Sequence, residues 1–275
     1  MVRSGARRRG VSVTTVLGAA YSASAAAWAV GPSRIYDRMA EELLARSPVA
    51  LSGRLVLDLG SGTGAATRAA QARGAQVIAA DAAVGMIEAG PAPGVVADAR
   101  QLPFADGAFG AVVAAFCLNH VDPPSVGLQE ARRVTADGGA VLASSYGDEL
   151  DHPVKRAVLE ALTSVGYALP AWYDAIQSGP AAALSTTRGM ASAARAAGLD
   201  GDVVEFDITF PDLGAADLVA WRLGMAHSAP FVASLPPDRR RAVVDRALDT
   251  LGSPPTLVRR MVVLYARVGR VSRPS

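Results

Sequence analysis

The segment Val56–Gly64 constrains the fold of this chain more than any other feature. It is Val-Leu-Asp-Leu-Gly-Ser-Gly-Thr-Gly, a short apolar run that ends in three alternating glycines. Glycine permits positive φ and close approach of another group to the backbone, and the Ala-rich segment 65–73 that follows is typical of a helix. A strand, a glycine turn and a helix in this order bind nucleotide-like ligands at the carboxyl edge of a parallel sheet. The segment therefore predicts an α/β fold with a ligand site at the glycine turn.

The rest of the chain continues this alternation of strand and helix. The early apolar runs are nearly continuous in Val, Leu, Ile and Ala, as in parallel strands that are covered on both faces. Strands are expected at 55–59, 76–80, 94–97, 111–117, 140–145, 203–210 and 261–268. Helices are expected at 65–73, 84–89, 126–134, 154–165, 171–177, 189–197, 215–226 and 238–251. This order predicts a doubly wound α/β sheet.

The same pattern divides the chain into five parts. We expect a disordered Arg-rich tail at 1–10, a helical segment at 11–50, a cofactor-binding α/β core at 51–150, a helical lid or substrate segment at 151–202, and C-terminal strands with inserted helices at 203–275. The Arg-rich start and the apolar stretch 11–30 imitate a secretory signal, but five serines and threonines dilute that stretch. We therefore favour a helix that packs on the core, no membrane span and a cytoplasmic location.

Composition narrows the function classes. One cysteine excludes a disulfide framework and a multi-cysteine metal site, and the three histidines lack metal-ligand spacing, so no metal site is predicted. Four of the 27 basic residues lie among the first ten residues. The remainder of the chain has 23 basic and 25 acidic residues, so its net charge is slightly negative. A body of that charge is not typical of a nucleic-acid-binding protein, which favours a small-molecule partner.

Two classes of cofactor fit the glycine turn. The segment Gly60–Ala65 matches the dinucleotide fingerprint, and Asp81, at the end of the second run, suits a ribose-binding acid in either class. Asp58 lies inside the motif, where its charge would repel a pyrophosphate. Asp98 ends the third run and offers a carboxylate to an adenine amino group. The two carboxylates favour a cofactor other than a dinucleotide.

At these positions the chain resembles class I S-adenosylmethionine-dependent methyltransferases, most closely the quinone-methylating and related small-molecule branch. The similar segments are Asp58–Gly64 for the family's first motif, D-x-G-x-G-x-G, Asp81–Ile87 for its second, Asp98–Phe109 for its third, and Glu130–Val134 with Gly138–Gly139 before the fifth strand. The resemblance spans about 36–146. It implies a seven-stranded sheet whose last pair is antiparallel, S-adenosylmethionine as the cofactor, and methyl transfer to a small acceptor.

The resemblance also implies which residues bind the cofactor. The glycine loop would approach its methionine part, and Asp81 would accept both ribose hydroxyls. Met86 would pack on the adenine, while Asp98 and the Ala99 N–H would bind its edge. The full set is Tyr36, Asp58, Gly60, Ser61, Gly62, Asp81, Ala82, Met86, Asp98, Ala99 and Cys117. The alternative is that the two later aspartates are helix N-caps and that the methionine and the cysteine are core residues.

The acceptor side is predicted from fewer signals. His120 follows the fourth run, on a loop that faces the substrate in this family, and is our candidate general base. The alternative is a structural histidine. An aromatic acceptor pocket is expected from Tyr146, Trp172, Tyr173 and Trp221, which could instead form only the core of a helical lobe.

Two other functions fit the same motifs. The first is an enzyme of this fold that catalyses another reaction, such as a cyclisation. The second is a non-catalytic partner subunit with a relic cofactor pocket. Only methyl transfer forms S-adenosylhomocysteine, so product analysis separates these possibilities.

Overall fold

The computed structural model describes residues 13–147 and 152–269, so the predicted tail at 1–10 lies outside the described residues. The described strands form a seven-stranded sheet in the order β3-β2-β1-β4-β5-β7-β6. The strands from β3 to β5 are parallel, and β7 is antiparallel to both of its neighbours. The predicted α/β sheet with an antiparallel last pair is confirmed.

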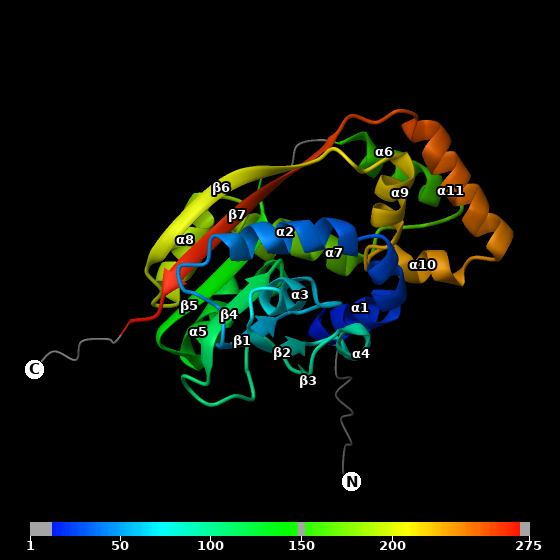
Figure 1. The fold of residues 1–275 in the computed structure, drawn as a ribbon. Coiled ribbons are helices and arrows are strands. Elements are labelled where there is room, and N and C mark those ends of the chain that lie inside the picture. Colours follow the sequence, from blue (N-terminus) through cyan, green and yellow to red (C-terminus); the bar gives the residue numbers. More distant parts are fainter. Residues whose placement is uncertain (1–12, 148–151, 270–275) are drawn as a thin grey trace, which may run out of the picture.

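The predicted strands and helices match the observed elements within a few residues (Figure 1). The strands are β1 (Leu55–Leu59), β2 (Gln76–Asp81), β3 (Gly94–Val96), β4 (Phe109–Ala115), β5 (Thr135–Tyr146), β6 (Gly201–Phe210) and β7 (Leu257–Arg267). The helices are α1 (Val13–Val30), α2 (Ser33–Ala45), α3 (Ala65–Gln71), α4 (Val84–Ala89), α5 (Pro124–Val134), α6 (Pro153–Thr163), α7 (Ala171–Ile176), α8 (Thr187–Ala196), α9 (Ala215–Leu223), α10 (Ala229–Ser234) and α11 (Pro237–Leu251).

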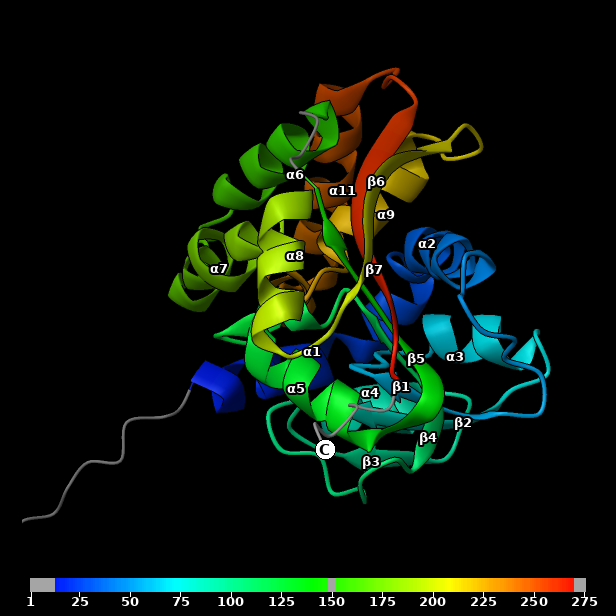
Figure 2. The ribbon, with the colours of Figure 1, turned by 90° about the vertical axis from the view of Figure 1, so that its left-hand side faces the viewer.

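The sheet lies between two layers of helices (Figure 2). Helices α2 and α3 cover one face, and α5 and α8 cover the other. Side chains alternate between the faces, so Val113 belongs to the first core cluster and its neighbour Val112 to the second. Burial of each such side chain contributes about 1.5–3 kcal/mol. The two cores therefore hold the strand ends, and with them the ligand site, in a fixed arrangement.

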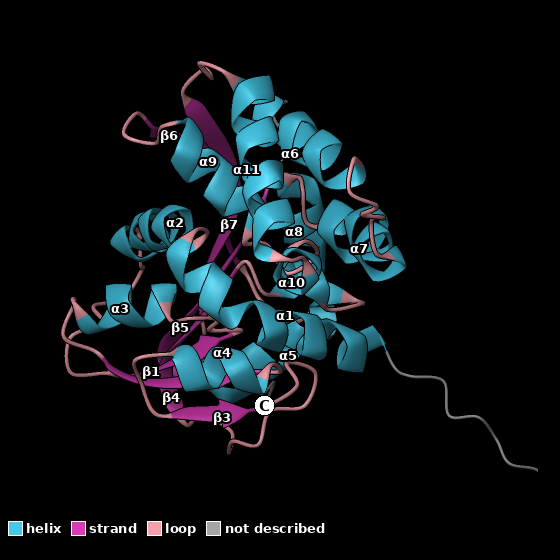
Figure 3. Ribbon diagram, turned by 90° about the vertical axis from the view of Figure 1, so that its right-hand side faces the viewer, coloured by secondary structure: helices cyan, strands magenta, loops and turns pink. Residues whose placement is uncertain are grey.

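The N-terminal segment forms two helices, because the chain turns at Gly31 and Pro32 between them. A Cβ on Gly31 would lie 2.3 Å from the carbonyl oxygen of Ala220 in α9, so only glycine allows this contact. Helix α1 also packs alongside α4 (Figure 3). There a Cβ on Gly85 of α4 would lie 2.7 Å from the carbonyl oxygen of Ser22 in α1. Helix α1 is thus packed onto the α/β core.

Helices α6, α9 and α11 pack on one another beside the long antiparallel strands (Figure 1). Helix α10 was not predicted from the sequence. No helix within the described ranges is both long and apolar enough to span a membrane.

Candidate functional site

A cavity of about 350 Å³ lies at the carboxyl ends of β1, β2 and β4. The order of the strands reverses between β1 and β4, and ligands of open α/β sheets bind at such a point. The cavity also has a size typical of small-molecule sites. All the residues that the sequence predicts to bind a cofactor lie on its wall. Their individual contacts with a cofactor stay predictions.

The glycine loop forms the floor of this cavity. Gly60 has φ +68° and Gly62 has φ +53°. A Cβ on Gly60 would lie 2.3 Å from Sγ of Cys117. The space next to Gly60 is therefore filled by the cysteine side chain and is not open to a ligand. A Cβ on Gly62 would meet no atom within 4 Å. Gly62 is therefore the position at which a side chain would enter the cavity.

Asp81 joins the loops that follow β1 and β2. Its Oδ2 accepts the backbone N–H of Gly62 over 2.9 Å, and its Oδ1 accepts that of Ala83 over 2.8 Å. Helix α4 has Ala83 as its N-cap residue, without a side-chain cap bond, so the helix-cap alternative does not describe Asp81. Burial raises the pKa of Asp81, and the backbone N–H groups partly offset that rise.

Asp58 is buried beneath the same loop. Its Oδ2 accepts the hydroxyl of Thr67 over 2.6 Å, and the side chain is inaccessible to solvent. Burial raises the pKa of Asp58 to about 6, more than the Thr67 hydrogen bond lowers it. Asp58 is therefore held mainly by a neighbour in α3.

Asp98 lies at the rim, after β3. Its Oδ1 accepts a hydrogen bond from Nε of Arg100 over 3.0 Å, and its Oδ2 accepts one from a terminal nitrogen of the same guanidinium over 2.6 Å. The Arg100 backbone N–H also donates to Oδ1. These bonds lower the pKa of Asp98. Its carboxylate is engaged by Arg100, so the adenine contact predicted for it would be shared with that ion pair.

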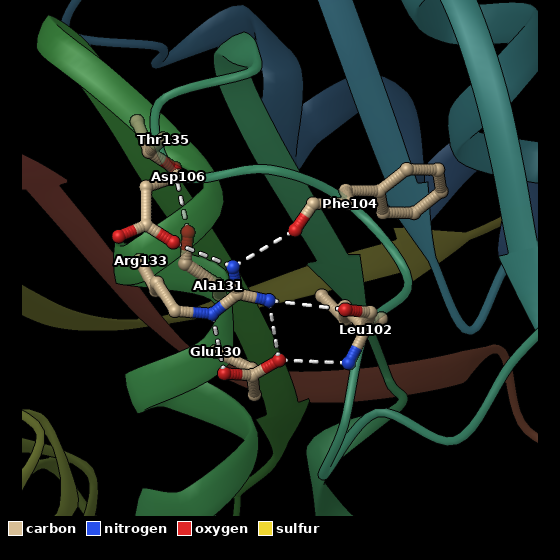
Figure 4. A network of polar contacts seen from close by, with 7 residues as sticks. All are labelled: Leu102, Phe104, Asp106, Glu130, Ala131, Arg133 and Thr135. Carbon is tan, nitrogen blue, oxygen red and sulfur yellow. Dashed lines mark hydrogen bonds and ion pairs between the residues drawn. The ribbon is translucent and has the colours of Figure 1, made fainter.

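Arg133 fixes the loop that carries this rim (Figure 4). It donates to the carbonyl oxygens of Leu102 over 3.0 Å and Phe104 over 2.8 Å, and it forms ion pairs with Glu130 and Asp106 at 2.7 Å. Glu130 in turn accepts the Leu102 N–H over 2.7 Å. The Glu130–Val134 segment singled out in the sequence therefore ties α5 to the loop after β3.

His120 lies on the cavity wall, in the short turn after β4. The hydroxyl of Tyr21, a residue of α1, lies 3.0 Å from its Nε2. Burial lowers the pKa of His120 to about 4, so the imidazole is neutral near pH 7. The role of His120 as a general base stays a prediction, but a base of such low pKa takes a proton from a hydroxyl poorly.

The predicted aromatic wall is divided by the structure. Trp172 and Tyr173 line the cavity, and the Tyr173 ring stacks on His227 with 4.2 Å between ring centroids. Tyr146 and Trp221 do not line it. Tyr146 lies behind Phe116, with the two ring centroids 4.6 Å apart, and Trp221 is 1% exposed in the helical core. Aromatic residues in a sequence suit a core and a pocket wall equally, so the sequence does not separate these two residues from the two that line the cavity.

Sequence reasoning missed three aromatic residues of the wall, Tyr21, Trp28 and Phe116. Tyr21 and Trp28 lie on α1, for which no contact with the site was predicted. Phe116 has φ +54°, which is uncommon for a residue other than glycine. A backbone conformation of this kind, at a strand end beside a cavity, leaves no signal in the sequence.

Comparisons with known proteins agree with this geometry. Residues 57–143 match a family model described as "Methyltransferase domain". Demethylmenaquinone methyltransferase of Mycolicibacterium vanbaalenii is 38% identical over 154 residues, which cover 55% of this chain and 64% of the relative. The corresponding protein of Mycolicibacterium gilvum is 37% identical over the same length. The chain thus matches somewhat less than two thirds of the length of these curated relatives.

Solved structures share the fold at low identity. The YcgJ protein from Bacillus subtilis has a TM-score of 0.51 at 17% identity, and covers 84% of this chain and 98% of its own. The cyclase SpnF has a TM-score of 0.53 at 22% identity, and covers 85% and 81%. Residues 57–143 of the α/β core are thus similar in sequence to the methyltransferase class of domains, and the strand order and the glycine loop agree with that match. Within that class, the relatives named above are demethylmenaquinone methyltransferases.

Proposed function

We propose that this protein transfers a methyl group from S-adenosylmethionine to a small, uncharged acceptor that is apolar or aromatic. One observation carries the proposal: a single cavity joins the glycine loop and Asp81 to a wall of aromatic side chains from α1 and α7. Both substrates of a methyl transfer need to meet in one chamber of this kind. A cytoplasmic location, where such a cofactor is made, belongs to the same proposal.

The residues present fit the cofactor. Gly62 leaves open space that a Cβ would fill. Ser61 has a buried hydroxyl without a hydrogen-bond partner in the described part of the chain, although it lines the cavity. A buried hydroxyl without a partner costs about 1–3 kcal/mol, so a polar ligand group that bonds to it would be favoured. Asp81 would hold the ribose hydroxyls, and the loop after β3 would hold the adenine.

The charged residues of the cavity wall all belong to strands or to the loops that follow them. They belong to Asp58, Asp81, Asp98, Arg100 and Asp122, on β1, at the end of β2 and in the loops after β3 and β4. The wall that the helical segments contribute has aromatic and aliphatic side chains such as Trp172 and Ile176 on α7, together with His227 after α9. Burial lowers the pKa of His227 to about 3, so this wall carries no charge near pH 7. An uncharged acceptor suits it.

When bound, S-adenosylmethionine supplies a methyl group made electrophilic by its positively charged sulfur. The contribution of the chain is to hold the acceptor in line with that group and to exclude water. Such positioning can lower a barrier by about 7–11 kcal/mol. The aromatic rings of Tyr21, Tyr36 and Tyr173 on the cavity wall are suited to both tasks.

Methyl transfer is tested with the full chain, S-adenosylmethionine labelled in its methyl group, and reduced demethylmenaquinone with a short side chain as the first acceptor. The relatives' names support this choice of acceptor. Label in the extracted acceptor together with S-adenosylhomocysteine supports the proposal. Conversion of the acceptor without S-adenosylhomocysteine would favour a cyclase-like reaction instead. Failure to bind S-adenosylmethionine in calorimetry would overturn the proposal as a whole.

A further inference from the structure

The contact between Tyr21 and His120 joins residues that lie 99 positions apart in the sequence. The two rings meet edge to face, with 5.5 Å between centroids and 69° between planes. Both residues line the cavity. No other hydrogen bond of the Tyr21 hydroxyl occurs within the described residues. Among the described residues, His120 Nε2 is the protein atom to which this buried hydroxyl can donate.

Asn119 supports the same assignment of the proton. Its side-chain nitrogen lies 3.5 Å from His120 Nε2. In this orientation of the amide, whose oxygen is buried without a partner among the described residues, the NH₂ group and the tyrosine hydroxyl approach one ring nitrogen and can both donate to a lone pair there. A neutral imidazole with a lone pair on Nε2 carries its proton on Nδ1. That nitrogen is buried and has no partner in the part of the chain that the structure describes.

We propose that Tyr21 is a positioning residue, which holds His120 as the neutral tautomer protonated on Nδ1, so that the Nε2 lone pair is engaged by Tyr21 and His120 does not remove a proton from the acceptor. The role of His120 toward the acceptor rests on the proposed function, whereas the tautomer does not. Any proton that the acceptor loses would then pass to a group other than His120.

The surroundings of the pair are consistent with a neutral ring. Burial alone lowers the pKa of His120, with no contribution from a charged neighbour. The titratable groups that act on Tyr21 are Tyr146, Asp81, Tyr173 and Cys117, and with burial they raise its pKa well above the usual value, so that the hydroxyl stays a donor. Asp122 follows His120 by two residues on the same loop and also lines the cavity.

The tautomer can be measured directly by ¹⁵N–¹H NMR of the full chain labelled with ¹⁵N-histidine. The chain has three histidines, so the His120 signals are assigned by their loss in His120→Gln. We expect the Nδ1–H neutral form to dominate from pH 8 down to pH 5. In Tyr21→Phe, which lacks only the hydroxyl, we expect the Nε2–H form to increase at least threefold.

Tyr265→Phe is the matched control, because it removes a buried tyrosine hydroxyl that does not line the cavity. It should leave the His120 signals in place. A wild-type spectrum dominated by Nε2–H, a ring that titrates near pH 6.5, or no response to Tyr21→Phe would overturn the inference. These results do not depend on methyl transfer. Loss of the proposed function would therefore show in the product assay and leave the spectra unaffected.

Discussion

Gly62 donates its backbone N–H to Oδ2 of Asp81 over 2.9 Å, and this bond ties the glycine loop after β1 to the end of β2. The other carboxylate oxygen accepts the N–H of Ala83. Because both residues line the cavity, one side chain sets the shape of the loop and also faces the ligand space. Substitutions of Gly62 and Asp81 therefore test whether the shape of this loop and the binding of a ligand depend on the same contacts.

Asp81→Ala should weaken the binding of S-adenosylmethionine at least tenfold, which corresponds to about 1.4 kcal/mol. The substitution removes the acceptor of two backbone N–H groups and the carboxylate assigned to the ribose hydroxyls. Charge-assisted hydrogen bonds of this kind contribute about 1.5–3 kcal/mol each. Calorimetric titration gives the dissociation constant. Asp249→Ala, at an exposed position on α11, is the control and should bind like the wild type. An unchanged constant for Asp81→Ala would leave that residue a purely structural role.

Gly62→Ala should also weaken cofactor binding at least tenfold, and Gly62→Val should abolish it. The added methyl group would enter the cavity, since no protein atom lies within 4 Å of its position. The left-handed backbone adds a strain of about 1–2 kcal/mol for any residue other than glycine, so stability also falls. Calorimetry and thermal unfolding measure the two effects separately.

Gly53→Ala is the matched control for that experiment. Gly53 also has positive φ and open space around its Cβ position, but it does not line the cavity. It should lose a similar amount of stability and keep its affinity for the cofactor. Equal losses of affinity in both variants would mean that strain, and not the space in the cavity, determines binding.

Asp58→Asn should stabilise the protein at neutral pH. The pKa of Asp58 is about 6 in the fold and near 4 in an unfolded chain. The folded state thus holds the Asp58 proton more tightly, and the contribution of Asp58 to stability is greatest below pH 4 and is lost as the pH rises through 6. Asparagine cannot titrate, and its oxygen can still accept the Thr67 hydroxyl. The advantage of the variant should therefore grow from pH 4 to pH 7 by about 2 kcal/mol, most of the free energy equivalent to two pKa units. Urea unfolding at both pH values measures it, and a constant difference would contradict the burial argument.

The sequence predicted the sheet because each strand is a short apolar run that ends at a turn. β1 occurs at the predicted residues 55–59, and the glycine turn follows it directly. The prediction of one helical segment at 11–50 did not use the turn signal Gly31-Pro32, and the close approach of Gly31 to Ala220, almost two hundred residues away, has no local signal. Helix α10 has only six residues, too few for a helical period to be recognised.

The sequence motifs predicted which residues line the cofactor side of the cavity. They did not predict the residues that reach the cavity only through the packing of distant segments. Residues of the glycine loop and the strand ends meet at one sheet edge because parallel strands end together there. The pairing of His120 with Tyr21 depends on how α1 crosses the cavity, and no local pattern encodes that crossing. Trp221 and Trp172 lie on similar helices, and only packing puts one in the core and the other on the wall.

That difference between the two tryptophans gives the last prediction. Trp172→Ala should lower kcat/KM for the acceptor about ten- to hundredfold, since a lost aromatic contact is worth about 1.5–3 kcal/mol of burial. It should leave the affinity for S-adenosylmethionine and the melting temperature nearly unchanged, because Trp172 is only partly buried. Kinetics with reduced demethylmenaquinone, or the acceptor found in the product assay, provide the measurement.

Trp221→Ala should have the opposite profile. Removal of a fully buried tryptophan costs about 3–5 kcal/mol of folding free energy, and Trp221 is 1% exposed. Trp221→Phe, which retains most of the packing, keeps the comparison possible if the alanine variant does not fold. Trp221→Phe should melt at a lower temperature than the wild type but keep the wild-type KM for the acceptor, because the side chain at position 221 does not line the cavity. A raised KM in Trp221→Phe together with an unchanged KM in Trp172→Ala would place the acceptor on the other side of α9, against the arrangement proposed for this cavity.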